Sequence, residues 1–282
     1  MADPVAAEKE LERAAQAVSI PSCPRILIDL GQETRKPEPD LRKIEALVAK
    51  DMGLLATLLK TVNSPFYGLR SKIATVRQAI QVIGIDMLSR TVTGIVLKKS
   101  VGGDPARMEA FWDASAKAAL VAAFIAKQLP GVNKDEAYTF GLFQNCGIPI
   151  LMQRFADYGQ TLEKANGNAE RKHTEVEEEA HGTDHATVGY LVTRSWNLPE
   201  DISQAIRYHH DYALLADAQA KLSNQSRSLM AIGLAADHAL HEYAGDQASL
   251  EWAKGGRYAL AHLGLSQPEF DEIVSDLAVM LG

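Results

Sequence analysis

The sequence predicts an all-α fold, a multi-helix bundle with a helical subdomain at its N-terminus. Apolar residues recur three and four positions apart through most of the 282 residues, as they do on the buried face of an amphipathic helix. Residues that cap helices, such as Asp40, Asp51 and Thr75, stand directly before several of these apolar runs. The alternation of apolar and polar residues that is typical of strands does not occur in the sequence.

In the N-terminal half, an amphipathic helix is predicted over 5–18, and Pro21 and Pro24 end it. A short helix over 27–30 and a polar linker over 31–39 follow. Asp40 and Asp51 then cap two helices. The inward residues of these two helices are Leu41, Ile44, Leu47 and Val48, followed by Leu54, Leu55, Leu58, Leu59 and Val62. Thr75 caps a helix that ends at Gly84, and a further helix is predicted over 87–96.

The turn over 63–70 carries three large apolar side chains in a few residues. Pro65 stops the preceding helix because proline lacks an N–H group and disfavours the α region for the residue before it. Phe66, Tyr67 and Leu69 surround Gly68, so we interpret the turn as a packed wedge in a helix–loop–helix core element. We expect Phe66 and Tyr67 to be structural anchors that join the two halves of the molecule.

Gly102-Gly103-Asp104-Pro105 marks the predicted boundary between an N-terminal helical half, 1–104, and a second helical half, 105–282. Breaks are expected near Gly147 and Pro149 and around Gly182. The predicted helices of the second half cover 108–129, 135–155, 170–196, 198–210, 223–243, 247–263 and 268–281.

Composition predicts a soluble, cytoplasmic protein with no membrane segment. The formal net charge of −7 argues against a general nucleic-acid coat protein, and 46% hydrophobic residues are ordinary for a globular chain. The longest apolar run, 118–126, is shorter than the ~20 residues that a membrane helix needs. Cys23 and Cys146 stand in neither a metal-binding nor a redox motif, so a reducing compartment is expected.

The central turn and the helix after it resemble the signature of the HDOD domain, a bacterial signalling relative of the HD-type metal phosphohydrolases. The matching motifs are Asn-Ser-x-Phe-Tyr-Gly-Leu at 63–69, Val-x-x-Ala-Ile at 76–80 and Ile-Gly at 83–84, and the resemblance resumes from 112 to 237. It implies an HD-like bundle. The residues assigned to the signature and to interaction are Asn63, Ser64, Phe66, Tyr67, Gly68, Arg70 and Arg77.

Histidine spacing is the first indication of chemistry. His181, His185, His209 and His210 stand close together in the sequence, and Asp237 follows. His181 and His185 would share a face of a continuous helix, but Gly182 is expected to break it. Adjacent histidines point about 100° apart on a helix, so only one of His209 and His210 is expected to face a given pocket. Histidines satisfied within the core or on the surface are the alternative.

The resemblance also implies which residues form the site and which have been lost. His185, His209, His210 and Asp237 resemble metal ligands of the HD hydrolases. The other half of the site departs from the HD pattern. Ala114 stands where the family's first histidine is expected, and Gln144-Asn145 stands where the His-Asp pair is expected.

This departure predicts a degenerate, non-catalytic site. A dimetal reaction needs anionic ligands, which lower the pKa of a bridging water, whereas alanine offers no donor and neutral amides bind transition metals poorly. We therefore expect no cofactor, or at most one weakly bound divalent metal. Our first hypothesis is a regulatory, signal-transducing module that binds a protein or ligand. The alternative is a metal-dependent phosphohydrolase or phosphodiesterase acting on nucleotides or cyclic dinucleotides.

Charge is unevenly distributed and bears on the partner. A basic excess lies over 61–100, and acidic residues, Glu175 and Glu177–Glu179, precede His181. Two solvated helix faces are the simple interpretation. The functional interpretation is a basic surface that meets another signalling protein or a nucleotide messenger. A nucleic-acid partner is the weakest of these alternatives.

Overall fold

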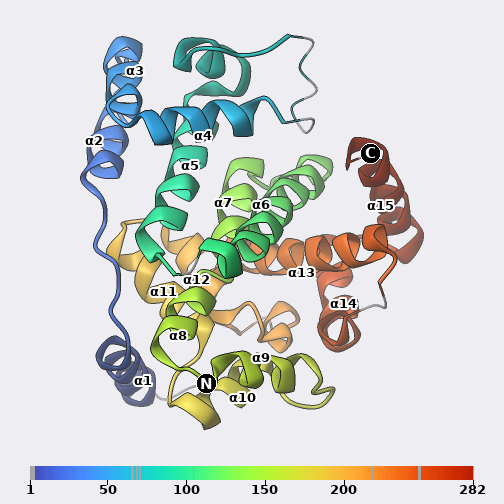
Figure 1. Ribbon diagram of the computed structural model, residues 1–282. Coiled ribbons are helices and arrows are strands. Elements are labelled where there is room, and N and C mark those ends of the chain that lie inside the picture. The colour runs from blue at the N-terminus through green and yellow to red at the C-terminus, as the bar shows by residue number, and fades with distance from the viewer. Residues whose placement is uncertain are drawn as a thin grey trace. The chain divides into compact units, whose positions relative to one another are not determined.

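The computed structural model describes residues 4–64, 67, 69, 71–103, 105–217, 219–246 and 249–281, apart from the side chains of 4–8, 10, 105–107 and 278–281. These residues form helices, turns and no strand, which confirms the predicted all-α class (Figure 1). The chain divides into two compact units. One unit covers Ser22–Gly102, and the other joins the residues up to Pro21 to Gly103–Val279. The division differs from the predicted boundary chiefly in the first helix.

Among the residues that the structure describes, the smaller unit contains four helices. They are α2 (Arg25–Thr34), α3 (Leu41–Ala49), α4 (Met52–Val62) and α5 (Val76–Val101). Asp40 and Asp51 cap α3 and α4 as predicted, because each carboxylate accepts from backbone N–H groups of the first turn. Helix α2 continues through Gly31, so the predicted linker begins later than expected. Glu33, on this extra turn, is fully buried and is bound by Lys36 and Lys43.

Asn63 closes the signature turn. Its amide donates to the carbonyls of Leu59 at 2.7 Å and Ile73 at 2.8 Å, and its oxygen accepts from the Ile73 N–H. Asn63 therefore holds the two ends of the loop together, because its side chain bonds the backbone at each end. Phe66, Gly68 and Arg70 lie outside the described residues. Tyr67 is half-buried, and the predicted anchoring role of the two aromatic rings stays a prediction.

Helix α5 is bent at Gly84, whose φ of 81° and ψ of 166° are not helical. Glycine adopts this conformation readily because it has no Cβ. The predicted stop at Gly84 is therefore a sharp kink after which the chain resumes the helix. By length and composition this helix could cross a membrane, although 44% of its most apolar window is buried within the protein. The core helices of soluble proteins have the same properties.

The larger unit contains α1 and all helices from α6 onward (Figure 1). Their bounds are α1 (Pro4–Ala17), α6 (Pro105–Gln128), α7 (Lys134–Phe143), α8 (Gly147–Arg154), α9 (Tyr158–Asn166), α10 (His173–His181), α11 (His185–Ser195), α12 (Glu200–Tyr208), the 3₁₀ helix η2 (Tyr212–Leu215), α13 (Asn224–Ala244), α14 (Leu250–Leu263) and α15 (Gln267–Leu281). Helix α9 was not predicted, since its apolar residues are few.

The core of this unit is built on α6, which packs against α7 and α13. Alanine-rich α6 allows close approach: a Cβ at Gly141 of α7 would meet the Ala118 carbonyl at 2.9 Å. A second close approach positions the candidate site. A Cβ at Gly147 would lie 2.1 Å from the His185 carbonyl oxygen, so only glycine lets α8 pack this tightly on α11.

Candidate functional site

The candidate site lies where α10, α11 and the end of α12 meet. Gly182, with φ of 70°, ends α10 in the left-handed conformation, and Asp184 begins α11. The Asp184 carboxylate accepts from the N–H groups of Ala186 and Thr187 and from the Thr187 hydroxyl. This Gly–x–Asp turn makes His185 the first residue of α11, as the expected helix break required.

Three of the predicted histidines are in contact. The Nε2 atom of His185 lies 3.1 Å from Nε2 of His210 and 3.2 Å from Nε2 of His209. The expectation that only one of the adjacent histidines faces a given pocket is therefore wrong. It assumed that the helix continues, but α12 ends at Tyr208, and His209 is its C-cap. The turn that follows the helix directs both rings to His185.

Glu177 fixes the backbone and the ring of His185 through hydrogen bonds. Its fully buried carboxylate accepts from the His185 N–H at 2.9 Å, from His185 Nδ1–H at 2.7 Å and from the Tyr158 hydroxyl at 2.6 Å. The sequence had suggested an acidic solvated face over this stretch. For Glu177 that interpretation is wrong, because the residue lies on the inward face of α10.

Glu251 of α14 holds His210 in the same manner. Its carboxylate accepts from His210 Nδ1–H at 2.7 Å, from the Tyr212 hydroxyl at 2.5 Å and from Lys254 at 2.7 Å. Two of the three histidines thus have a carboxylate on Nδ1 and present Nε2 to each other. The sequence alone gave no indication of Glu251, which stands 41 residues after its partner.

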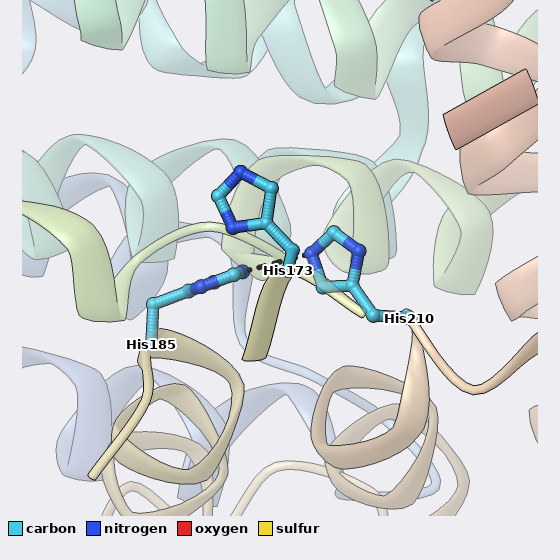
Figure 2. A group of neighbouring side chains, drawn as sticks. All are labelled: His173, His185 and His210. Atoms are coloured by element: carbon cyan, nitrogen blue, oxygen red, sulfur yellow. Dashed lines mark hydrogen bonds between the residues drawn. The ribbon is translucent and has the colours of Figure 1, made fainter. Parts of the chain in front are cut away.

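His173 is a further histidine of this cluster that the sequence analysis missed. Its ring stacks on His210 with centroids 5.1 Å apart and meets His185 edge-on at 5.6 Å. Single ligand atoms of His173, His185 and His210 all lie within 4.8 Å of one another (Figure 2). A signal was present: His173 and Glu177 are four apart and so share a helix face.

The other predicted site residues have different surroundings. Asp237 accepts from the Gln144 amide, with Nε2–Oδ distances of 3.2 and 3.3 Å. Gln144 is buried, Asn145 is half-buried and Ala114 is exposed on α6. His181 lies outside the cluster. It bonds Thr161 and stacks on Phe155, at a centroid distance of 4.5 Å.

The pKa values of the three contacting histidines are shifted in different directions. Burial lowers the pKa of His210 to about 4, although Glu251 opposes this. Burial, with the neighbouring His210 and His185, also holds the pKa of His209 well below its ordinary value. Burial acts in the same direction on His185, but the Glu177 carboxylate outweighs it and raises the pKa of His185. Burial, with the charge of Glu251, raises the pKa of Asp237 to about 7.

The basic stretch of the smaller unit is partly neutralised by its own carboxylates. Arg77 pairs with Glu45 at 2.5 Å, and Lys99 pairs with Asp51 at 2.6 Å. These exposed pairs reduce the positive charge available to a partner. They favour the simple interpretation of a solvated helix face at these two positions.

The helical architecture, with histidines at the start of α11 and directly after α12, defines an all-α domain with a buried histidine cluster. More particularly, the HDOD domain family matches residues 20–212, and the chain belongs to this family. One curated relative is an "Uncharacterized protein" of Treponema pallidum, 23% identical over 197 residues. The match covers 68% of this chain and 38% of that protein, so this chain corresponds to well under half of the relative's length.

Solved structures share the fold. An HDOD domain protein of unknown function from Geobacter sulfurreducens is 23% identical, with a TM-score of 0.71 over 97% of this chain and 95% of that one. A "Putative signal transduction protein" from Marinobacter aquaeolei VT8 is 19% identical, with a TM-score of 0.71 over 98% and 66%. A "Putative phosphohydrolase" from Shewanella amazonensis SB2B is 17% identical, with a TM-score of 0.63 over 97% and 98%.

Proposed function

We propose that the protein is a non-catalytic regulatory module that acts by binding a signalling protein or a small ligand. The observation that carries the proposal is the bond from the Gln144 amide to the Asp237 carboxylate. In an HD hydrolase of the kind that the sequence resembles, the residue at the Gln144 position would be a metal ligand. Here it donates N–H groups, which a cation repels.

The residues do not fit a dimetal centre. Ala114 supplies no donor atom, and its side chain is exposed on α6. Gln144 and Asn145 are neutral, so Asp237 is the single carboxylate among the residues that correspond to the HD pattern. Two adjacent divalent cations need several anionic ligands to offset their repulsion. The proposal therefore includes no hydrolytic step.

A metal-dependent phosphohydrolase is the second candidate. The contact of His185 with His209 and His210 favours it, because clustered imidazoles are common metal ligands. A structural relative also carries a phosphohydrolase name, although the likeness is one of fold. Hydrolysis would need the remaining ligands to come from residues outside the HD pattern.

A binding role is supported by the structural relative named a "Putative signal transduction protein" and by the much longer curated relative. The partner we propose is another signalling protein, with a nucleotide second messenger as the alternative ligand. A cytoplasmic location in a bacterium belongs to the same proposal. It is supported by Cys23 and Cys146, both of which are free thiols.

Turnover measurements test the absence of catalysis. The full chain is assayed against a chromogenic phosphodiester, nucleotides and cyclic dinucleotides, with Mn²⁺ or Mg²⁺ added. We expect rates equal to those of His209→Ala and His210→Ala. Hydrolysis by the unmodified protein that both substitutions abolish would establish the enzyme instead. Affinity capture from the native host, with Arg77→Glu as the surface variant, then tests for a protein partner.

A further inference from the structure

The ring nitrogens of the cluster have an unusual arrangement. Nδ1 of His185 and of His210 each lie 2.7 Å from a carboxylate, which only accepts, so each Nδ1 donates a proton. Nδ1 of His209 likewise donates to the Ile206 carbonyl at 2.7 Å. In the neutral form of each ring, Nε2 is then a bare lone pair. The Nε2 atoms of His209 and His210 both lie within 3.2 Å of Nε2 of His185.

His173 adds a fourth nitrogen of the same kind. Its Nε2 lies 2.9 Å from the Asn166 oxygen, and we assign the ring proton to this contact. Nδ1 is buried and has no hydrogen-bond partner among the residues that the structure describes. The Glu177 carboxylate oxygen lies 3.5 Å away, a long contact that contributes to the lowered pKa of Glu177. If this single long contact is given up, the atom is available as a ligand.

One additional proton cannot compensate all of these Nε2 lone pairs. If His185 carries the extra proton on Nε2, it donates to either His209 or His210, and the other lone pair stays uncompensated. A divalent ion with bonds of ~2.1 Å separates neighbouring nitrogens by ~3.0–3.4 Å in octahedral or tetrahedral geometry. The observed His185–His210 separation of 3.1 Å falls in this range. The Nδ1 atom of His173 would have to move on the order of 1 Å to reach bonding distance of the same ion.

From this geometry we propose that His173, His185 and His210 bind one transition-metal ion of the class that prefers imidazole, such as Zn²⁺. Figure 2 shows the three rings gathered around one point, from α10, the start of α11 and the residue pair after α12. The proposal differs from the HD pattern in two ways: His173 belongs to no matched motif, and Asp237 is not a ligand. Metal binding at this site does not require that the protein hydrolyses a substrate.

The surrounding carboxylates support this assignment. Glu177 and Glu251 bind the Nδ1–H groups of His185 and His210, an arrangement that orients metal-ligating histidines and strengthens them as donors. Neutral imidazoles select Zn²⁺, Ni²⁺, Cu²⁺ or Fe²⁺, whereas Mg²⁺ and Ca²⁺ prefer oxygen ligands. The bound ion would hold α10, α11 and the end of α12 together.

Cobalt titration tests the proposal. The full chain, without an affinity tag and after treatment with a chelator, is titrated with Co²⁺, whose visible absorption reports its ligands. We expect one equivalent to bind, with displacement by Zn²⁺ but not by millimolar Mg²⁺. His173→Ala removes a ligand and should weaken binding on the order of 100-fold or more, because altering only the partners of metal ligands already costs about 10–100-fold.

The matched control is His181→Ala, because His181 lies on the same helix but bonds Thr161 instead. It and Asp237→Asn should bind Co²⁺ as the unmodified protein does. Circular dichroism checks that each variant is folded. No Co²⁺ absorption in the unmodified protein, or equal affinity in the folded His173→Ala variant, would overturn the proposal. Hydrolysis is scored separately, so failure of the metal site and failure of the proposed function are distinguishable.

Discussion

At the scale of single residues, Glu177 has the largest structural role in the site. It is one of four acidic residues within five positions, and it alone of Glu175 and Glu177–Glu179 is fully buried. The charge of His185, with the groups that donate to the carboxylate, outweighs the cost of burial and lowers the pKa of Glu177. The charge is therefore compensated inside the protein.

Glu177→Gln should destabilise the protein by roughly 2–4 kcal/mol. The amide keeps the shape but loses the negative charge that the surrounding donors compensate, and its N–H₂ group faces those donors. Urea denaturation at pH 7 measures the change. Glu178→Gln, on the exposed face of the same helix, is the control and should change the free energy of unfolding by less than about 0.5 kcal/mol. Equal effects of the two substitutions would contradict the assigned role.

Asp237 provides a pH-dependent prediction. Its folded-state pKa of about 7 is above the ordinary value of 3.8, so folding favours the protonated form. This contribution is fully present below pH ~4 and is lost as the pH rises through 7. Asp237→Asn should therefore be more stable than the unmodified protein at pH 8–9, by about 1–3 kcal/mol, and the difference should shrink towards pH 4.

Thermal or urea denaturation of both proteins over this pH range measures the difference. Asparagine keeps an oxygen for the Gln144 amide, so the hydrogen bond itself is retained. A difference that stays constant with pH would show that Asp237 is ionised normally in the folded protein.

At the scale of elements, the site depends on how closely α8 packs on α11. The contact is made by Gly147 at the start of α8, and it fixes the backbone of His185. Two turns with special conformations complete the arrangement. Gly182 ends α10, and the end of α12 at Tyr208 directs His209 and His210 to one point. The histidines converge because three helices begin or end there.

Gly147→Ala should destabilise the protein by about 3 kcal/mol or more, or prevent folding. The new Cβ would lie 2.1 Å from a backbone oxygen, so whole helices must shift. Gly159→Ala on α9 is the matched control, because nothing lies within 4 Å of its added Cβ. It should be neutral or stabilise by about 0.4–1 kcal/mol. Urea denaturation compares the two, and a mild effect of Gly147→Ala would contradict the close helix contact.

At the scale of the whole molecule, the chain forms two compact units, and the first helix groups with the larger one. Residues up to Pro21 group with the larger unit, and the connection between the units includes Gly102 and Gly103, both exposed. Within the larger unit, α1 packs against α11, and the Trp196 indole N–H donates to the Pro21 carbonyl at 2.9 Å. The N-terminal segment is thus bound to the unit that contains the histidines.

Limited proteolysis should cut the chain first near residues 102–103. Exposed glycine pairs between compact units are preferred sites of cleavage, because few contacts cross them. Mass spectrometry of the early fragments from a protease of broad specificity measures this. Rapid first cleavage within α6 or α13 would contradict the division into two units.

Local patterns in the sequence determined the helical class, most helix bounds and the caps at Asp40, Asp51 and Thr75, whereas the contact of His185 with both His209 and His210 was implied only by the family resemblance. The class, bounds and caps depend on spacing along the chain, which periodicity and turn residues report directly. Helix α9, the extra turn of α2, the burial of Glu177 and the roles of His173 and Glu251 were decided by tertiary structure. Each depends on which neighbour covers a side chain, and the carboxylate that orients His210 comes from 41 residues away. Separation of this kind leaves no local pattern, because the free energy of burial and hydrogen bonding is set only when distant helices meet.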